Sequence, residues 1–154
     1  MASGYSGPVS GSYWELTPKQ SIELECARRG QAAVVAGCMR LLRREEVDDD
    51  LLIALGGPRA QSILDAGSPK VHQYWFRVWG ARGLLHAYDD EAEQAVIGAL
   101  TDEHWRVREM AAKVVARHRI GGALTAVAEL RDDPVPRVRA AGERATVLLT
   151  AAGS

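Results

Sequence analysis

Apolar and polar positions follow the period of an α-helix from Thr17 to the end of the chain. Within 104–118, for example, Val107, Ala111 and Val114 recur at spacings of four and three, which places them on one helical face. The segment that begins at Thr17 reads Thr-Pro-Lys-Gln, a capping box with proline at the first helical position. Two-residue alternation with a tight hairpin turn is missing from the sequence. The pattern predicts an all-α fold.

Short links rich in Pro, Gly and Asp divide the chain into a series of predicted helices. Such short links make successive helices fold back as antiparallel neighbours. Residues 1–12 are rich in Gly and Ser and are expected to form a flexible tail, which leaves 13–154 as a single domain. The expected helices cover residues 18–29, 31–44, 48–56, 59–66, 70–87, 90–101, 104–118, 120–131 and 134–150.

The sequence repeats itself at an interval of 31 residues. Segments 75–82, 106–113 and 137–144 align, and an apolar residue followed by arginine recurs in all three. A helical hairpin with one apolar stripe cannot bury that stripe alone, so such units stack in runs of three or more. The repeated arginines are Arg77, Arg108 and Arg139.

Another column of the repeat holds only small residues, namely Gly80, Ala111 and Gly142. A glycine inside a helix costs about 1 kcal/mol relative to alanine, so two in one column indicate close approach of neighbouring backbones. We therefore expect leucine at Gly80 or Gly142 to overpack the hairpin and to destabilise the fold by about 1–3 kcal/mol.

Segments 102–112 (Asp-Glu-His-Trp-Arg-Val-Arg-Glu-Met-Ala-Ala) and 132–141 (Asp-Asp-Pro-Val-Pro-Arg-Val-Arg-Ala-Ala) resemble HEAT repeats, in particular the short HEAT-like units of the bilin-lyase type. The resemblance is good over 90–150, fair over 58–87 and weak before that. It implies a short right-handed α-solenoid of helical hairpins with an N-terminal helical cap. The clearest repeats are expected at 58–87, 90–118 and 120–150.

The resemblance also implies a ladder between the aspartate of each turn and the arginine of the second helix. The position before Arg77 that would carry this aspartate is Val71, so Arg77 is expected to lack that partner. A phosphate-binding role for the arginine column is the alternative interpretation. The implied pairs are Asp102 with Arg108 and Asp133 with Arg139.

Polar residues opposite the apolar stripe share one face of each second helix. In HEAT-like solenoids the second helix lines the concave surface, so the resemblance implies that three such stripes lie side by side. This face would gather basic side chains around a single acid, and an ordinary solvated face is the alternative. The predicted binding residues are Trp75, Arg82, His86, Arg106, Glu109, Lys113, Arg117, Arg137 and Arg144.

An aromatic cluster, Tyr74-Trp75-Phe76-Trp79, opens the first aligned segment. Phe76 and Trp79 fall on core columns of the repeat, whereas Trp75 does not. An exposed tryptophan beside arginines is a good interface anchor or a platform for a stacked base. A large side chain that seals an irregular first repeat is the alternative.

Charge changes this picture only through its placement. The 154 residues hold 19 Lys and Arg against 20 Asp and Glu, a formal net charge of -1. A uniformly basic surface for nucleic acid is therefore excluded, whereas a basic patch is not. The repeat divides the arginines into a structural column and a candidate binding face.

Motifs for catalysis or metal binding are missing from the sequence: it holds no HExxH pair, no zinc-type Cys/His spacing and no glycine-rich phosphate loop. We expect no catalytic residue, no metal and no cofactor. Cys26 and Cys38 lie twelve residues apart in helical stretches, as reduced thiols in the cytosol would. A secretory leader and a membrane-length apolar run are also missing, so a cytoplasmic location without a membrane partner is expected.

Two functions from different classes remain open. The first is a non-catalytic scaffold or adaptor that binds a partner protein or acidic peptide on the concave second-helix face. The second is nucleic-acid binding or DNA repair, because one family of alkylpurine DNA glycosylases is also built from HEAT-like repeats. Bilin attachment, suggested by the repeat subtype alone, is a third and weaker alternative.

Overall fold

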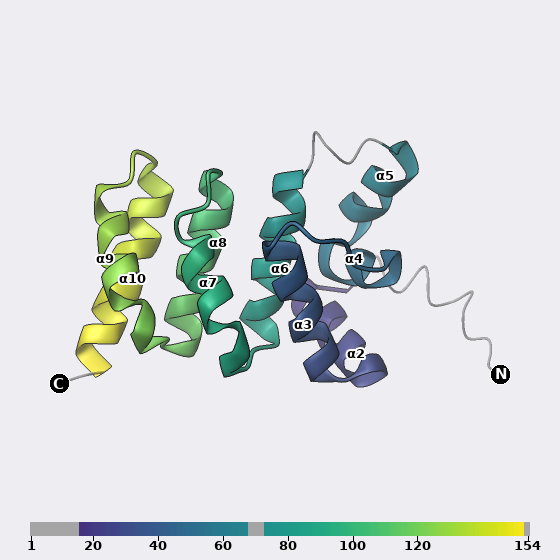
Figure 1. Ribbon diagram of the computed structural model, residues 1–154, viewed down its shortest axis with the longest axis horizontal. Helices are drawn as coiled ribbons and strands as arrows, with labels where there is room; N and C mark the ends of the chain where they lie inside the picture. Colours follow the sequence, from purple (N-terminus) through teal and green to yellow (C-terminus); the bar gives the residue numbers. More distant parts are fainter. Residues whose placement is uncertain (1–15, 68–72, 153–154) are drawn as a thin grey trace.

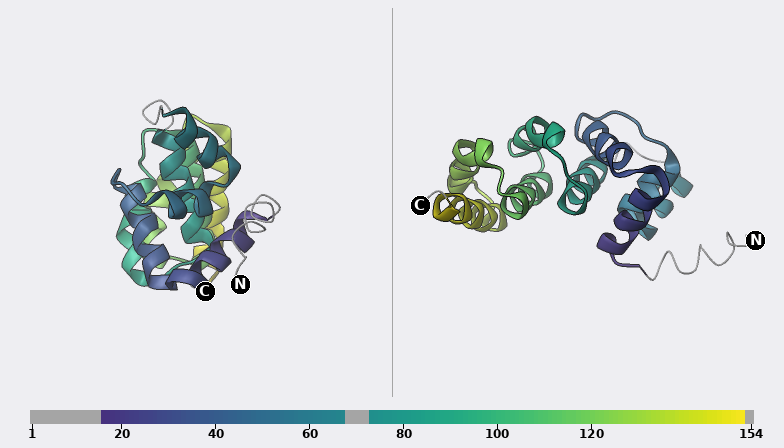
Figure 2. Two further views of the ribbon diagram at one scale, coloured as in Figure 1. Left: turned by 90° about the vertical axis from the view of Figure 1, so that its right-hand side faces the viewer. Right: turned by 90° about the horizontal axis from the view of Figure 1, so that it is seen from below.

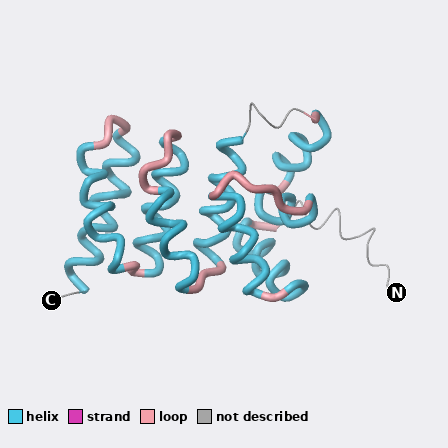
Figure 3. The backbone as a smooth tube through the Cα atoms, in the orientation of Figure 1, coloured by secondary structure: helices cyan, strands magenta, loops and turns pink. Residues whose placement is uncertain are grey.

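The computed structural model describes residues 16–67 and 73–152, and this part of the chain is helical without a strand (Figures 1 and 3). The predicted all-α fold is confirmed. The helices are α2 (Pro18–Arg29), α3 (Gln31–Leu42), α4 (Asp49–Gly56), α5 (Pro58–Ala66), α6 (Gln73–His86), α7 (Glu93–Ala99), α8 (Trp105–His118), α9 (Leu124–Glu129) and α10 (Pro136–Ala152). The 3₁₀ turns are η2 (Asp90–Ala92), η3 (Gly121–Ala123) and η4 (Leu130–Asp132).

The local signals in the sequence place most helix ends correctly. In α2 the Thr17 hydroxyl accepts the backbone N–H of Gln20 at 3.1 Å, and the Gln20 side chain accepts that of Thr17 at 2.9 Å. This confirms the predicted capping box. The first helices of the two C-terminal hairpins are shorter than expected, because 3₁₀ turns form part of each. The predicted tail, 1–12, and the expected start of the helix at 70–87 lie outside the described residues.

The helices stack in two rows, as a short helical-repeat solenoid requires. The right-hand view of Figure 2 shows α3, α7 and α9 in an outer row and α6, α8 and α10 in an inner row. Each outer helix packs against the inner helix beside it, and α6, α8 and α10 pack against one another in that order. Helices α2, α4 and α5 lie at the α6 end of the stack (Figure 2). The inner row therefore brings the three aligned second helices side by side.

The helix pair at the N-terminal end of the two rows is not the expected hairpin of 59–66 with 70–87. Helix α6 packs against α3, and α5 packs against α4. Glycines on α6 explain this choice, because a Cβ on Gly80 would lie only 2.9 Å from the carbonyl oxygen of Cys38 and 3.0 Å from Cβ of Leu41. The α3 backbone thus approaches α6 where no side chain stands between them.

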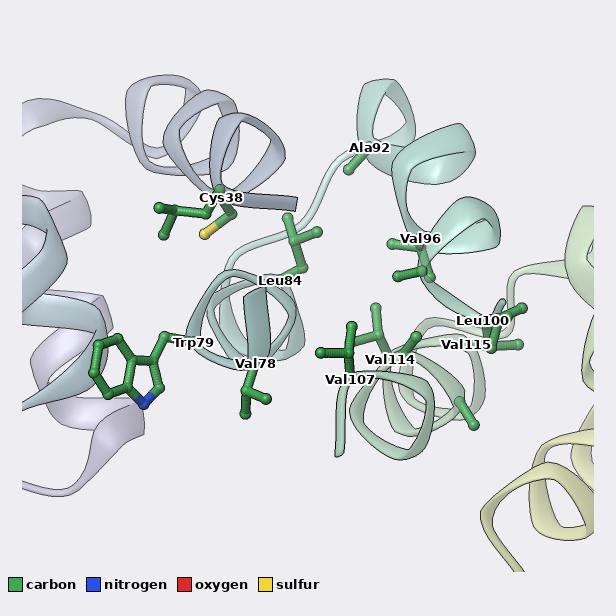
Figure 4. Packing of buried hydrophobic residues seen from close by; sticks show 14 of the residues in the cluster. Cys38, Val78, Trp79, Leu84, Ala92, Val96, Leu100, Val107, Val114 and Val115 are labelled. Atoms are coloured by element: carbon green, nitrogen blue, oxygen red, sulfur yellow. The ribbon is translucent and has the colours of Figure 1, made fainter. Parts of the chain in front are cut away.

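The core runs along the whole stack between the two rows (Figure 4). Val107 and Val114 of α8 and Val96 of α7 are buried, and Leu84 of α6 continues the same layer toward α3. Trp79 points from α6 toward α4 instead and is only 2% exposed. It lies where a Cβ on Gly56 would come within 2.6 Å of the indole ring. A large ring therefore fills the space between α6 and the N-terminal helices.

The column of small residues marks close helix contacts, as predicted. A Cβ on Gly142 of α10 would lie 2.6 Å from Cβ of Leu130 and 3.0 Å from the carbonyl oxygen of Val127. Ala111, the equivalent residue of α8, is fully buried. At Gly142 even a methyl group therefore has no room without a shift of the neighbouring helix, and a larger side chain has less.

Buried ion pairs link neighbouring repeats, but not the pairs that the resemblance implied. Asp102 accepts two hydrogen bonds from Arg77, at 2.7 and 3.2 Å, and Asp133 accepts two from Arg108, at 2.7 and 3.1 Å. Arg77 therefore has the carboxylate that it was expected to lack. Arg139 pairs with no carboxylate among the described residues and donates to the backbone carbonyl of Asp133 at 2.8 Å.

The turn before each second helix explains this direction. One oxygen of Asp102 accepts the backbone N–H of His104 at 2.8 Å, and one of Asp133 accepts that of Val135 at 2.9 Å. These bonds fix each carboxylate at the start of its own helix, where it meets the arginine of the preceding repeat. Arg108, the expected partner of Asp102, donates instead to its backbone carbonyl at 2.9 Å. We call the two pairs, Arg77–Asp102 and Arg108–Asp133, the Arg–Asp ladder.

Hydrogen bonding dominates the ionisation of the ladder carboxylates. Burial raises the pKa of Asp102 and Asp133, but the bonds from Arg77 and Arg108 and from the backbone outweigh it. Both pKa values consequently lie below the ordinary value for aspartate.

Candidate functional site

A hollow of about 720 Å³ lies between α8 and α10 on the inner row. Five cationic side chains and one carboxylate, that of Glu109, surround it. The remaining lining is apolar. We call this feature the α8–α10 hollow. Its cations are Lys113, Arg117, Arg119, Arg137 and Arg144. Its apolar residues are Leu85, Ala116, Ala140, Ala141 and Leu148.

Five of the nine predicted site residues line the hollow: Glu109, Lys113, Arg117, Arg137 and Arg144. They meet because α8 and α10 present the same side of the repeat along the inner row. Arg119, which the sequence did not predict, follows the last helical residue of α8 and adopts a left-handed conformation with φ of 52°. Its signal was a basic residue at a helix C-terminus, where cations are favoured by the helix dipole.

Glu109 was predicted to face outward, and this prediction is wrong. It is buried, with 9% of its surface exposed, because it lies between α8 and α10. Its carboxylate lies 3.0 Å from Nε of Arg137 and 3.7 Å from Nζ of Lys113. One acid therefore holds two of the cations of the hollow in position.

A second feature continues from the hollow toward the N-termini of the inner helices. Guanidinium groups and indole rings alternate along it, with Arg59 at 4.8 Å from the centre of the Trp75 ring and Arg106 at 5.2 Å from the same ring. Arg106 also lies 4.6 Å from the Trp105 ring, and Arg137 lies 5.5 Å from it. We call these five residues the Trp–Arg row. It crosses α5, α6, α8 and α10.

The row contains two predicted residues besides Arg137 and two that the sequence analysis missed. Trp75 and Arg106 were predicted, whereas Arg59 and Trp105 were not. Arg59 belongs to α5, outside the repeated columns, and Trp105 lies one position before the aligned segment. The only available signal was the Trp-Arg dipeptide itself, which recurs nowhere else in the repeat.

The arginines of the row have few hydrogen-bond partners. Within residues 16–67 and 73–152, the guanidinium groups of Arg59 and Arg106 form no ion pair, and Arg137 is bound only by Glu109. The Arg137 side chain is 62% exposed. Stacking on an indole occupies the face of a guanidinium group and leaves its in-plane N–H donors available.

Trp75 takes part in aromatic packing and in cation–π contacts. Its ring centre lies 6.2 Å from that of the buried Trp79, so it extends the aromatic packing at the start of α6. It also supports Arg59 and Arg106. Two guanidinium groups over one ring leave little of it for a stacked base.

Arg82 was predicted to belong to the binding face, but it does not line the α8–α10 hollow. It is partly buried beside α4 and donates from Nη2 to the carbonyl oxygen of Leu55 at 2.7 Å. Its Nε is buried without a hydrogen-bond partner among the described residues, and burial lowers its pKa. Arg82 therefore binds a carbonyl group in the last turn of α4.

His86, another predicted residue, lies at the end of α6. It is partly buried, and burial lowers its pKa, with further contributions from nearby Arg117 and Arg82. The ring therefore favours its neutral form beside the basic side chains of this face. It does not line the α8–α10 hollow.

His104 positions the start of α8 and hence Arg106. Its Nδ1 accepts the backbone N–H of Arg106 at 3.2 Å, and its ring stacks on Tyr74 with centres 3.7 Å apart. Burial and the charge of Arg106 lower its pKa. The neutral ring is the form that can accept this bond.

Neither metal ligands nor a membrane segment emerge from the described part of the chain. No group of three His, Cys, Asp or Glu side chains gathers as metal ligands would, and none of the described helices combines the length and apolarity needed to cross a bilayer.

A family model described as HEAT repeats matches residues 58–146, from α5 into α10. Comparison with curated proteins and with solved structures found no match.

Proposed function

Because this chain belongs to the HEAT-repeat family, whose repeats generally mediate protein–protein interaction, we propose that it is a non-catalytic binding module for an acidic protein segment. The binding surface in this proposal is the α8–α10 hollow on the inner row. Acidic side chains of the partner would lie at the cationic rim, and apolar ones would lie on the floor.

One observation carries the proposal: five cations and one carboxylate line a hollow together with five apolar residues, in a chain whose net charge is -1. The excess of positive charge is therefore local, and charge complementarity selects an acidic partner. Leu85 and Leu148 supply the apolar contacts that a peptide needs for affinity beyond charge.

Nucleic acid is the alternative that the same cations suggest. The phosphate backbone needs a continuous basic track, and single-stranded bases need open aromatic faces. The carboxylate of Glu109 lies among the cations of the hollow, and the rings of Trp75 and Trp105 are already stacked by arginines, which leaves no open aromatic face for a base. These observations favour a peptide.

Fluorescence anisotropy with a labelled peptide tests the proposal. The probe is a short fluorescein-labelled peptide of Glu, Asp, Leu and Ala with one central Ser. We expect it to bind the wild-type protein and to bind Arg144→Glu about tenfold more weakly, because the charge of an exposed rim residue is reversed. Arg43→Glu is the matched control, since Arg43 is exposed at the end of α3 and outside the hollow.

Two results would overturn the proposal. One is equal binding of the peptide to wild type, Arg144→Glu and Arg43→Glu, which would place the peptide elsewhere. The other is a DNA or RNA oligonucleotide that binds more tightly than the peptide at about 50 mM salt and loses affinity steeply as salt rises.

A further inference from the structure

The molecule itself shows what a structural arginine looks like in this fold. Arg77 and Arg108 are only 4% and 15% exposed, and each makes two hydrogen bonds to a buried carboxylate. Arg106 differs from both: its guanidinium group makes no hydrogen bond or ion pair to the described residues, although it forms cation–π contacts with two indole rings. An arginine that is held in place with unused donors is prepared to bind an anion.

The charge of the Trp–Arg row indicates which anion fits. Arg59, Arg106 and Arg137 contribute three positive charges, and Glu109 is the one carboxylate paired with them among the described residues. The row therefore has an excess of two positive charges. A carboxylate would compensate one of them, whereas a phosphate monoester carries a charge of about -1.5 to -2 and three acceptor oxygens.

The position of the row connects it to the proposed peptide site. Arg137 stacks on Trp105 in the row and also lines the α8–α10 hollow, where Glu109 holds it at 3.0 Å. A peptide in the hollow that continues toward the start of α8 would bring a side chain next to Arg106.

We infer that the Trp–Arg row binds the phosphate group of a phosphorylated serine or threonine in the partner segment. This inference rests on the proposed function, because the phosphate is carried by the peptide that occupies the hollow. Arg106 supplies the central pair of donors, and Trp75 and Trp105 keep its guanidinium plane oriented. A nucleic-acid phosphate is less suitable, because the flanking base would find both indole rings stacked by arginines.

Paired peptides test the inference. The unphosphorylated peptide described above is compared with the same peptide phosphorylated on its serine. We expect phosphorylation to tighten binding by about tenfold or more, as strong charge-assisted hydrogen bonds would. In Arg106→Lys the gain should disappear, since lysine keeps the charge but loses the planar donor pair. Arg144→Lys, a matched change outside the row, should retain the gain.

A direct measurement locates the phosphate. With 5-fluorotryptophan incorporated, the ¹⁹F signals of Trp75 and Trp105, assigned from Trp→Phe variants, should shift when O-phosphoserine is added, and acetate should leave them unchanged. Trp79, which is 2% exposed, serves as the internal control and should not respond. In Arg106→Lys the shifts should be lost.

The outcomes separate this inference from the proposed function. Equal affinity of the two peptides for wild type, or a phosphorylation gain that persists in Arg106→Lys, overturns the phosphate site and leaves the hollow intact. Shifts with O-phosphoserine that depend on Arg106, without binding of the unphosphorylated peptide, support the phosphate site and overturn the hollow as a peptide site. An oligonucleotide that displaces the phosphopeptide with higher affinity overturns the choice of a peptide ligand.

Discussion

The Arg–Asp ladder and the Trp–Arg row use the same residue type at positions two apart in the sequence, with opposite results. In Arg106-Val107-Arg108, Val107 is fully buried, Arg108 binds Asp133 of the next repeat, and Arg106 contacts two indole rings. Each residue of a helix is rotated by about 100° from the last, so side chains two apart lie on nearly opposite sides. Direction, and not residue type, decides which arginine is structural.

The ladder arginines and the row arginines differ in their exposure to water. Burial strips water from the ladder arginines, so the carboxylates, together with backbone carbonyls in the case of Arg108, must replace the lost hydrogen bonds. The row arginines keep contact with water, as the 62% exposure of the Arg137 side chain illustrates. Stability should therefore depend strongly on the ladder and weakly on the row, and binding should show the reverse.

The largest expected effect comes from removal of a ladder carboxylate. Asp102→Ala leaves the guanidinium group of Arg77, which is 4% exposed, buried and unpaired. We expect the free energy of unfolding to fall by about 3–5 kcal/mol, as measured by urea denaturation. Glu103→Ala, at the neighbouring exposed residue that contacts Arg44 at the surface, should change it by less than about 1 kcal/mol. Similar losses in both variants would remove the distinction between buried and exposed pairs.

Overpacking of the small column is expected to have the next largest effect. Gly142→Leu places side-chain atoms where a Cβ alone would lie 2.6 Å from Cβ of Leu130, so we expect a loss of about 1–3 kcal/mol. Gly98→Leu is the control, because no heavy atom lies within 4 Å of a Cβ at that site in α7. Leucine has a higher helix propensity than glycine, so this variant should be neutral or slightly stabilised. Thermal unfolding of the two variants measures the contrast.

Acid is expected to weaken the ladder through its carboxylates. Because the pKa of Asp133 is lowered in the folded state, the unfolded chain binds the proton first. Its contribution to stability is complete above the ordinary aspartate pKa, about 3.9, and is lost as the pH falls through the lower folded-state value. Unfolding free energies measured against pH should therefore fall less steeply below about pH 4 in Asp133→Asn.

The neighbouring Asp132 supplies the control for this titration. It is exposed and forms no ion pair within the described residues. Asp132→Asn removes the neighbouring negative charge and leaves the pair of Asp133 with Arg108 intact, so it is the matched control variant. Parallel pH curves for wild type and Asp133→Asn would mean that the ladder carboxylate contributes nothing through its ionisation.

Local patterns allowed most of the fold to be predicted from the sequence. The capping box at Thr17 lies within one helix, the 31-residue repeat has the length of one hairpin, and Gly142 contacts Val127 and Leu130 of its own hairpin. The packing of α3 against α6 could not be predicted from local patterns, because α3 carries no copy of the repeat. Its signal was indirect: Gly80 had to face some backbone, and the sequence did not say which one.

The candidate site was predictable to the extent that it follows the repeat. Lys113, Arg117 and Arg144 occupy repeated outward positions and do line the hollow. Glu109 was predicted to be exposed and is buried, because residues of α10, and not of its own helix α8, shield it from solvent. Arg59 escaped prediction because the row crosses from α5 to α6 through space.

The smallest expected effect is that of Arg106→Lys. It can be compared directly with Arg108→Lys, the same substitution two residues further along α8. Arg106→Lys removes stacking on Trp75 and Trp105, so we expect a loss of unfolding free energy below about 1 kcal/mol, as for a partly exposed cation–π contact. Arg108→Lys replaces the two bonds to Asp133 and the bond to the carbonyl of Asp102, and should lose about 1–3 kcal/mol.

Denaturant unfolding of the two lysine variants measures this difference under identical conditions. A larger loss in Arg106→Lys than in Arg108→Lys would make the Trp–Arg row a structural element and would leave no reason for its unused donors. The expected order instead separates an arginine that holds repeats together from one whose donors are free for a ligand. Since both variants keep the net charge, the order cannot arise from a general electrostatic change.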